Sequence, residues 1–151
     1  LHYPKEKIVV EDLLIERGFG EGEGMSLQEM KERYPDSDCP GMESREELVK
    51  RAGQAFQKIT DVFCDAERIL LAAHGAVLFA LLEAVSAEPI PYEGRAACIR
   101  QGSLYRIRRE EGGNRIAMYE DGAGAPAGEK AAGRFVEMDA AGIGQSAKIY
   151  L

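Results

Sequence analysis

Two short segments carry the side chains that could do chemistry, and the first is His74-Gly75-Ala76, which lies between two apolar runs. If the first run is a strand and the second a helix, His74 ends the strand and the amides of Gly75 and Ala76 open the helix. Such a helix start favours an anion. The imidazole of His74 suits phosphate binding or proton transfer, because the pKa of histidine lies near neutrality. Position alone is equally compatible with a core histidine that is hydrogen bonded at a strand end.

The second segment is Glu16-Arg17, which a glycine-rich run follows. Taken as a dipeptide, Glu16-Arg17 is more often a surface ion pair than part of a site. In a site, Glu16 would be a general acid if burial raised its pKa, and Arg17 would bind an anionic substrate. The glycine-rich run is neither a dinucleotide fingerprint nor a phosphate-binding loop. No strand leads directly into it, no helix opens from it, and no Lys-Ser/Thr pair follows.

Composition narrows the class of protein. A chain of 151 residues favours one domain with a real core. A net charge of -7 gives no electrostatic support to nucleic-acid binding. Cys39, Cys64 and Cys98 lack a Cys-x-x-Cys spacing, which favours reduced thiols and a cytoplasmic location. Only two histidines are present, which argues against a histidine-rich metal site. Neither a membrane-spanning run nor a signal peptide is visible.

Two helices are predicted before the histidine segment. Capping boxes at Ser26-x-x-Glu29 and Ser44-x-x-Glu47 mark their starts. The first helix ends at Pro35, with Leu27, Met30 and Tyr34 as its apolar stripe. The second runs from Arg45 to about Cys64. Its predicted core stripe is Leu48, Ala52, Ala55, Phe56, Ile59 and Phe63. Its charged residues, Lys50, Arg51 and Lys58, are expected to face solvent.

The remaining elements predict an α/β fold. Lys7 to Val10 is a short strand candidate, and residues 68–73 are apolar on both faces, as in a central parallel strand covered by helices. A helix follows over 76–85. Strands are predicted at 96–100, 103–109 and 115–119, with a hairpin turn at 111–114. Residues 121–133 have a linker-like composition, and the strand-like pieces beyond them are 135–138 and 148–151.

Several motifs follow one another in a recognisable order. They are Leu14-Ile15-Glu16-Arg17-Gly18-Phe19-Gly20-Glu21-Gly22-Glu23-Gly24, Tyr34-Pro35, Pro40-Gly41-Met42-Glu43-Ser44, Leu70-Leu71-Ala72-Ala73-His74-Gly75 and Ile99-Arg100-Gln101-Gly102-Ser103-Leu104. Over roughly residues 7–120, this order resembles the histidine phosphatase superfamily, which has the phosphoglycerate mutase-like fold. The resemblance implies a three-layer α/β/α domain with a mostly parallel central sheet over residues 1–120. Residues 121–151 would form a separate linker and C-terminal segment.

The resemblance also implies phosphoryl transfer through a phosphohistidine, with no metal and no cofactor. His74 would hydrogen bond the transferring phosphoryl group, and Glu16 would protonate the leaving oxygen. Arg17, Phe19, Gly75 and Ala76 would border the substrate. The expected ligand is a small phosphorylated metabolite or inorganic phosphate, with no nucleic-acid or membrane partner, and a homo-oligomer is compatible with this assignment.

The sequence departs from the family pattern at several positions. No Arg-His-Gly motif, which carries the family's nucleophile, occurs in it, and His2 is followed by Tyr3-Pro4. A Ser-x-Leu-x-Arg-Ala segment is missing too, Gly22 stands where many members have an aromatic residue, and Gln101 replaces an asparagine. The fold is therefore expected to be incomplete at its N-terminus, with an open edge at the middle of the sheet.

Three functions are compatible with this sequence. The first is a phosphatase, which the resemblance favours over a mutase. The second is a non-catalytic phosphate-binding or assembly module of the same fold. The third is an unrelated α/β domain that binds phosphate or a nucleotide at the helix start after His74.

Overall fold

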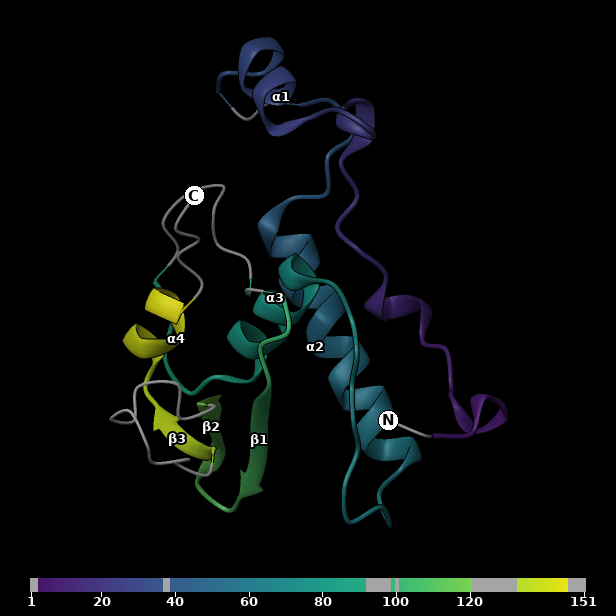
Figure 1. The fold of residues 1–151 in the computed structure, drawn as a ribbon, viewed down its shortest axis with the longest axis vertical. Coiled ribbons are helices and arrows are strands. Elements are labelled where there is room, and N and C mark those ends of the chain that lie inside the picture. Colours follow the sequence, from purple (N-terminus) through teal and green to yellow (C-terminus); the bar gives the residue numbers. More distant parts are fainter. Residues whose placement is uncertain (1–2, 37–38, 92–98, 100, 121–132, 147–151) are drawn as a thin grey trace, which may run out of the picture.

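The computed structural model describes residues 3–36, 39–91, 99, 101–120 and 133–146 (Figure 1). Its helices and strands are α1 (Leu27–Arg33), α2 (Arg45–Val62), α3 (Gly75–Val85), β1 (Tyr105–Glu110), β2 (Gly113–Glu120), β3 (Arg134–Met138) and α4 (Ala140–Ser146). Three short 3-10 turns precede α1, at Lys5–Lys7, Asp12–Leu14 and Gly20–Gly22. The chain before α1 is therefore held mainly by contacts other than a regular sheet or an α-helix.

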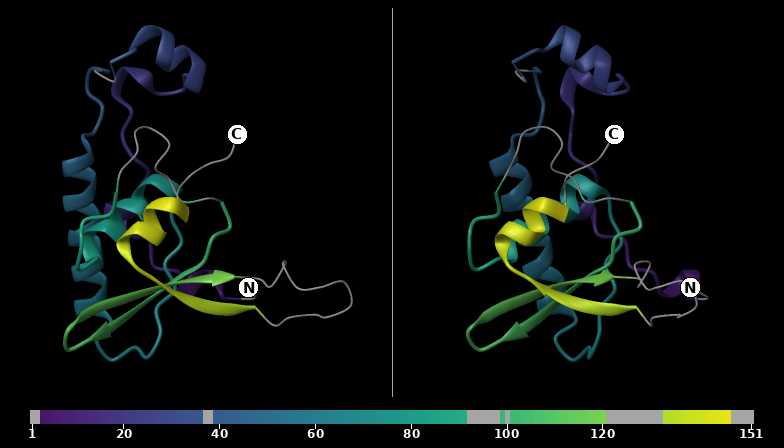
Figure 2. Two further views of the ribbon diagram at one scale, coloured as in Figure 1. Left: turned by 90° about the vertical axis from the view of Figure 1, so that its left-hand side faces the viewer. Right: turned by 60° about the vertical axis from the view of Figure 1, so that its left-hand side comes forward.

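Helix α3 lies at the centre of the main hydrophobic core. Its sequence is apolar on nearly every side, as expected for a helix that neighbours cover all round. Helix α2 packs along one side of α3, where the buried Ala52 belongs to the core and a Cβ at Gly53 would lie 3.3 Å from the Cβ of Ala84, so the two helices approach closely. The sheet and α4 cover another side (Figures 1 and 2). This packing fixes the start of α3, and therefore His74, relative to α2.

The described sheet is antiparallel, in the order β1-β2-β3. Ile107 pairs with Ile116, which in turn pairs with Met138, and all three side chains belong to the core. The side chain of Asn114 donates a hydrogen bond to the carbonyl of Val85 at 3.0 Å, which attaches the β1-β2 turn to the end of α3. The predicted hairpin is confirmed.

A small lobe around α1 stands away from the main core; we call residues 19–36 and 39–42 the α1 lobe (Figure 1). Its own hydrophobic cluster buries Met30, Tyr34 and Cys39. At its base, Phe19 and Met42 form an isolated antiparallel bridge, and the amide of Glu21 donates to the carbonyl of Pro40 at 3.0 Å. The glycine-rich run is therefore a folded turn, and its two ends are tied to the segment that leads into α2.

The predicted helices are confirmed, with corrections to individual residues. Both capping boxes are present in full, at Ser26 and at Ser44. Leu27 and Phe63, which were assigned to the apolar stripes, are exposed instead. Leu27 is the first residue of α1 and Phe63 lies just past the end of α2, so both stand at helix ends and outside the two hydrophobic clusters.

Two strand predictions are wrong. Residues 7–10 form the end of a 3-10 turn followed by an exposed extended stretch. Residues 68–73 form no strand either, and Leu70 is 65% exposed although its neighbours are apolar. An extended segment becomes a strand only when a second strand takes its backbone hydrogen bonds, and in the described part of the chain no strand pairs with either segment.

The architecture differs from the prediction in two further ways. The three described strands pair antiparallel, so the expected mostly parallel central sheet is not seen in the described residues. Helix α4 was not predicted, because residues 140–146 are rich in alanine and glycine and lack a clear apolar stripe. The strand predicted at 96–100 falls outside the described residues apart from Ile99, and the one at 148–151 lies wholly outside them.

The division of the chain at residue 120 stays a prediction. Strand β3 and helix α4 both lie beyond it, and they pack on β2 and on the main core. Of the helices in the described ranges, none combines the length and apolar character needed to cross a bilayer.

Candidate active site

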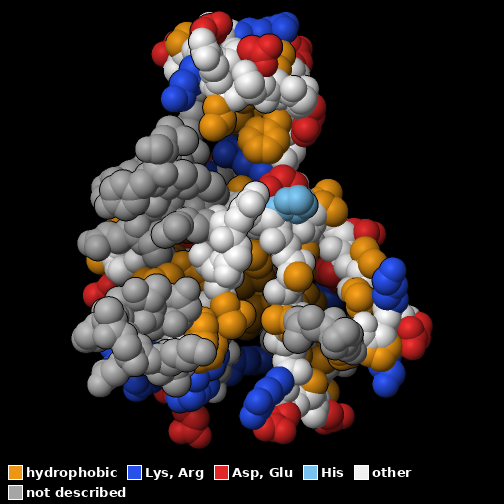
Figure 3. Space-filling view, in the orientation of Figure 1, with side chains coloured by type: hydrophobic (Ala, Val, Ile, Leu, Met, Phe, Trp, Pro, Cys, Tyr) orange, Lys and Arg blue, Asp and Glu red, His pale blue; other side chains and the backbone are white. Residues whose placement is uncertain are grey.

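His74 is the N-cap residue of α3, and its side chain does not cap the helix. The backbone around it is extended, and the carbonyl of His74 accepts the first hydrogen bond of the helix, from the amide of Leu78 at 3.0 Å. The first amides of a helix have no partner inside that helix, so those of Gly75 and Ala76 can receive an anion. The imidazole is 69% exposed, which rules out the core-histidine interpretation. A histidine is visible on the surface below the α1 lobe (Figure 3).

Glu16 lies beside His74. The Oε2 atom of Glu16 is 3.5 Å from the Nδ1 atom of His74, and its Oε1 atom accepts a hydrogen bond from the amide of Arg17 at 2.8 Å. The carboxylate of Glu16 is only 35% exposed, so it is half-buried next to a more exposed imidazole. A carboxyl group and an imidazole at this distance can act on the same small ligand, one as an acid and the other as a hydrogen-bond donor.

Arg17 joins the same region from the other side. Its Nε atom donates to the carbonyl of Glu43 at 2.8 Å, which turns the guanidinium toward the start of α2. Arg17 and Ala76 line one small cavity between α2 and α3, with a volume of about 20 Å³. The structure therefore brings Glu16, Arg17, His74 and the start of α3 together.

Phe19 lies elsewhere. It packs in the hydrophobic cluster of the α1 lobe, beside Met25 and Met42. Its amide donates to the carboxylate of Glu23 at 2.8 Å, and its carbonyl accepts from the thiol of Cys39 at 3.3 Å. Its observed contacts are structural, so its predicted place at the substrate stays a prediction.

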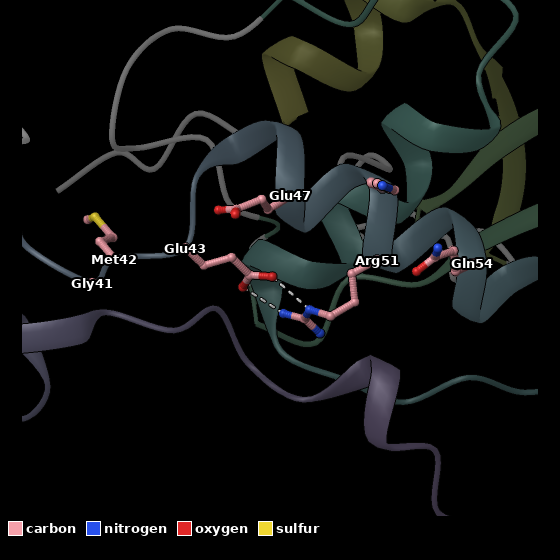
Figure 4. Close-up of a pocket in the computed structure, with 7 residues that line it drawn as sticks. Gly41, Met42, Glu43, Glu47, Arg51 and Gln54 are labelled. Carbon is pink, nitrogen blue, oxygen red and sulfur yellow. Dashed lines mark hydrogen bonds and ion pairs between the residues drawn. The ribbon is translucent and has the colours of Figure 1, made fainter.

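A larger open depression of about 650 Å³ lies beside these residues, between the start of α2 and the preceding loop (Figure 4). It is lined by Gly41, Met42, Glu43, Glu47, Lys50, Arg51 and Gln54. In it, Glu43 and Arg51 point toward one another and form a two-bond ion pair, with Nε to Oε1 at 2.7 Å and Nη2 to Oε2 at 2.8 Å. The Arg51 guanidinium holds the pKa of the Glu43 carboxyl below its ordinary value.

Comparison with known protein families gives one match to most of the chain. The model of the histidine phosphatase superfamily (branch 1) matches residues 2–122. The chain belongs to the histidine phosphatase superfamily. This membership confirms the family that the ordered motifs indicated, and it assigns the chain to an α/β fold class.

This chain is similar to the protein named uncharacterized phosphatase PhoE of Bacillus subtilis (strain 168). The two chains are 41% identical over 86 residues, which is 57% of this chain. The matched region spans 42% of the length of the Bacillus protein. The comparison with solved structures found no match.

Arg51 is a residue of the site region that sequence reasoning placed wrongly. It was assigned to the solvated face of α2, yet its side chain is only 17% exposed. A signal for its position was present, because Arg51 lies three residues after Leu48 and four before Ala55, on the core-facing stripe. Glu43 stood in a family-like motif but was given no role. The ion pair between Glu43 and Arg51 became visible only in the tertiary structure.

Proposed function

We propose that this chain has a phosphatase site, in which it binds the phosphoryl group of a small phosphate monoester and protonates the leaving oxygen. The observation that carries the proposal is the approach of Glu16 to His74 at 3.5 Å, at the start of α3. Family membership and the phosphatase-named relative support the type of activity.

The residues around His74 suit a phosphoryl group. A transferring phosphoryl group spreads negative charge over three equatorial oxygens, and catalysis consists mostly of positioning and electrostatic stabilisation. His74 can donate a hydrogen bond to one such oxygen, and the amides of Gly75 and Ala76 can receive another. Arg17, which lines a small cavity together with Ala76, adds a permanent positive charge near the start of α3.

Glu16 takes the role of the acid. In the transfer step the bond between phosphorus and the leaving oxygen breaks, and that oxygen takes a proton from the carboxyl group of Glu16. The nucleophile forms the new bond to phosphorus. The resemblance assigns it to a histidine in an Arg-His-Gly motif, which does not occur in residues 1–151. In this proposal, Glu16 supplies the acid, and His74, Arg17 and the start of α3 supply the phosphoryl-binding groups.

The test is release of inorganic phosphate from p-nitrophenyl phosphate and from a panel of small phosphate monoesters. We expect Glu16→Gln and His74→Ala each to lower turnover by about 10² to 10⁴-fold. Glu67→Gln is the matched control, because the side chain of Glu67 is 89% exposed and its ion pair among the described residues is with the equally exposed Arg68. Rates like those of the unaltered chain in both site variants would overturn the assignment of Glu16 and His74.

Binding of inorganic phosphate, measured by calorimetry, separates the phosphatase from the non-catalytic module of the same fold. Turnover that depends on Glu16 and His74 supports the phosphatase. Phosphate binding that is lost in His74→Ala, without turnover in the unaltered chain, supports the binding module instead.

A further inference from the structure

The segment that carries Glu16 has little regular structure of its own. Between residues 11 and 18 the chain forms a single 3-10 turn, at Asp12–Leu14. The other residues of this segment belong to no helix and no strand. Irregular backbone at a site must be held by side chains if its functional groups are to keep their positions. The contacts that hold this segment therefore decide where the carboxyl group of Glu16 lies.

Arg51, on α2, is the side chain that holds this segment. Its Nη1 atom donates to the carbonyls of Leu13 at 2.8 Å and Ile15 at 3.0 Å, and its Nη2 atom reaches the carbonyl of Glu16 at 3.4 Å. One guanidinium thus contacts three backbone carbonyls between Leu13 and Glu16. The remaining hydrogen bonds of Arg51 go to the carboxylate of Glu43.

Glu43 holds the other side of Glu16. Its Oε2 atom accepts from the amide of Gly18 at 3.2 Å, and its backbone carbonyl accepts from the Nε atom of Arg17 at 2.8 Å. Its own amide donates to the carbonyl of Gly18 at 2.8 Å. The residues before Glu16 are therefore attached to Arg51, and the residues after it are attached to Glu43.

We propose that the Arg51–Glu43 pair positions Glu16 beside His74, and that Arg51 is a positioning residue of the phosphoryl-transfer site. This inference rests on the proposed function for its catalytic consequence, but its geometric part can be tested without turnover. The pair connects the rigid helix α2, whose Ala52 is fully buried against α3, to the irregular segment that carries the acid.

An arginine is required at this position for a geometric reason. Its planar fork places donors in fixed directions, so it can bind the two oxygens of a carboxylate and still turn a further nitrogen toward backbone carbonyls. A lysine would keep the positive charge, but its single ammonium cannot reach the carboxylate and all three carbonyls at once. Arg51→Lys therefore keeps the positive charge but removes the hydrogen-bond geometry of the guanidinium, so the variant tests the geometry alone.

The first measurement is the nuclear magnetic resonance spectrum of the His74 imidazole at fixed pH. The chain has two histidines, so His74→Gln identifies the signal by its loss. We expect Arg51→Met to move the His74 signals in the same direction as Glu16→Gln does, because both remove the Glu16 carboxylate from Nδ1. Arg51→Lys should move them part of the way.

Lys58→Met is the matched control. Lys58 also lies on α2 and also pairs with the N-terminal segment, through Glu11 at 2.8 Å, but it contacts none of the three carbonyls. It should leave the His74 signals unchanged. Unmoved signals in folded Arg51→Met would overturn the inference. If that variant does not fold, Glu43→Gln takes its place, and unmoved signals there would overturn it equally.

The second measurement is enzyme turnover. In an active protein, Arg51→Lys should lower kcat by about 10- to 100-fold with a smaller change in KM, since a small misplacement of an acid acts mainly on the chemical step. A normal kcat in Arg51→Lys together with unmoved His74 signals would reject the positioning role while leaving the phosphatase intact. Moved signals in a chain without turnover would support the positioning role and reject the phosphatase.

Discussion

The Nδ1 atom of His74 lies 3.5 Å from the Oε2 atom of Glu16, although the two residues come from distant parts of the chain. Neither residue lies in a strand, and neither is near the other in the sequence. Glu16 ends an irregular segment held by α2, and His74 begins α3, so the packing of α2 against α3 creates their contact.

This contact predicts that Glu16 and His74 act as one unit. The double variant Glu16→Gln with His74→Ala should lose about as much turnover as the more damaging single variant, because groups that serve the same step give non-additive losses. Turnover of the four proteins with one phosphate monoester measures this. Losses that multiply would show that the two residues act independently. The control is the double variant Glu16→Gln with Glu67→Gln, which should lose no more turnover than Glu16→Gln alone.

The Arg51–Glu43 pair predicts a dependence of stability on acid pH. The pKa of Glu43 is lowered in the folded chain, chiefly by its hydrogen bonds to Arg51, so the carboxylate stabilises the fold above its unfolded pKa. That stabilisation is lost as the pH falls through the lower, folded pKa. The difference in unfolding free energy between the unaltered chain and Glu43→Gln should therefore shrink between about pH 6 and about pH 3.

Urea unfolding at several pH values measures this difference, and the Arg51→Met background is the control. Without Arg51 the main cause of the lowered pKa is gone, so Glu43→Gln should then have little pH-dependent effect. A difference that stayed constant with pH, or grew in acid, would contradict the role given to this pair.

Two glycines of the α1 lobe provide a matched test of its folded turn. Both have positive φ, +57° at Gly20 and +79° at Gly24. A Cβ atom at Gly20 would overlap the carbonyl oxygen of Pro40, whereas at Gly24 it would meet open space. Gly24→Ala should cost about 1 kcal/mol of unfolding free energy, from backbone strain alone. Gly20→Ala should lower the unfolding free energy clearly more, because it adds the overlap with Pro40. Equal losses of unfolding free energy in urea would contradict the contact between Gly20 and Pro40 at the base of the α1 lobe.

Helix α4 is predicted to contribute to the stability of the main core. Ile143 is 1% exposed and belongs to the cluster that surrounds α3. Ile143→Ala should lower the unfolding free energy by about 2–5 kcal/mol, from lost burial and the cavity left behind. Leu27→Ala, at an exposed position of α1, is the control and should have a small effect. A negligible cost for Ile143→Ala would show that α4 does not dock on the core.

The sequence by itself determined the elements that depend on near neighbours. The capping boxes at Ser26 and Ser44 start their helices, the apolar residues after His74 form α3, and the glycines at 112 and 113 close a hairpin. Caps, periodicity and turn chemistry act within a few residues, so they can be identified without knowing the fold. The ordered motifs likewise identified the family and proposed Glu16 and His74 as its site.

Only the tertiary structure decided which of these elements meet. Residues 68–73 have the composition of a buried strand but lie exposed, because a strand needs a partner for its backbone hydrogen bonds and no described strand supplies one. Arg51 is a charged residue, which sequence reasoning places on the solvated face of a helix. In the structure its guanidinium instead binds a carboxylate and three backbone carbonyls. Both outcomes depend on groups distant in sequence, and those contacts become definite only when α2, α3 and the N-terminal segment pack together.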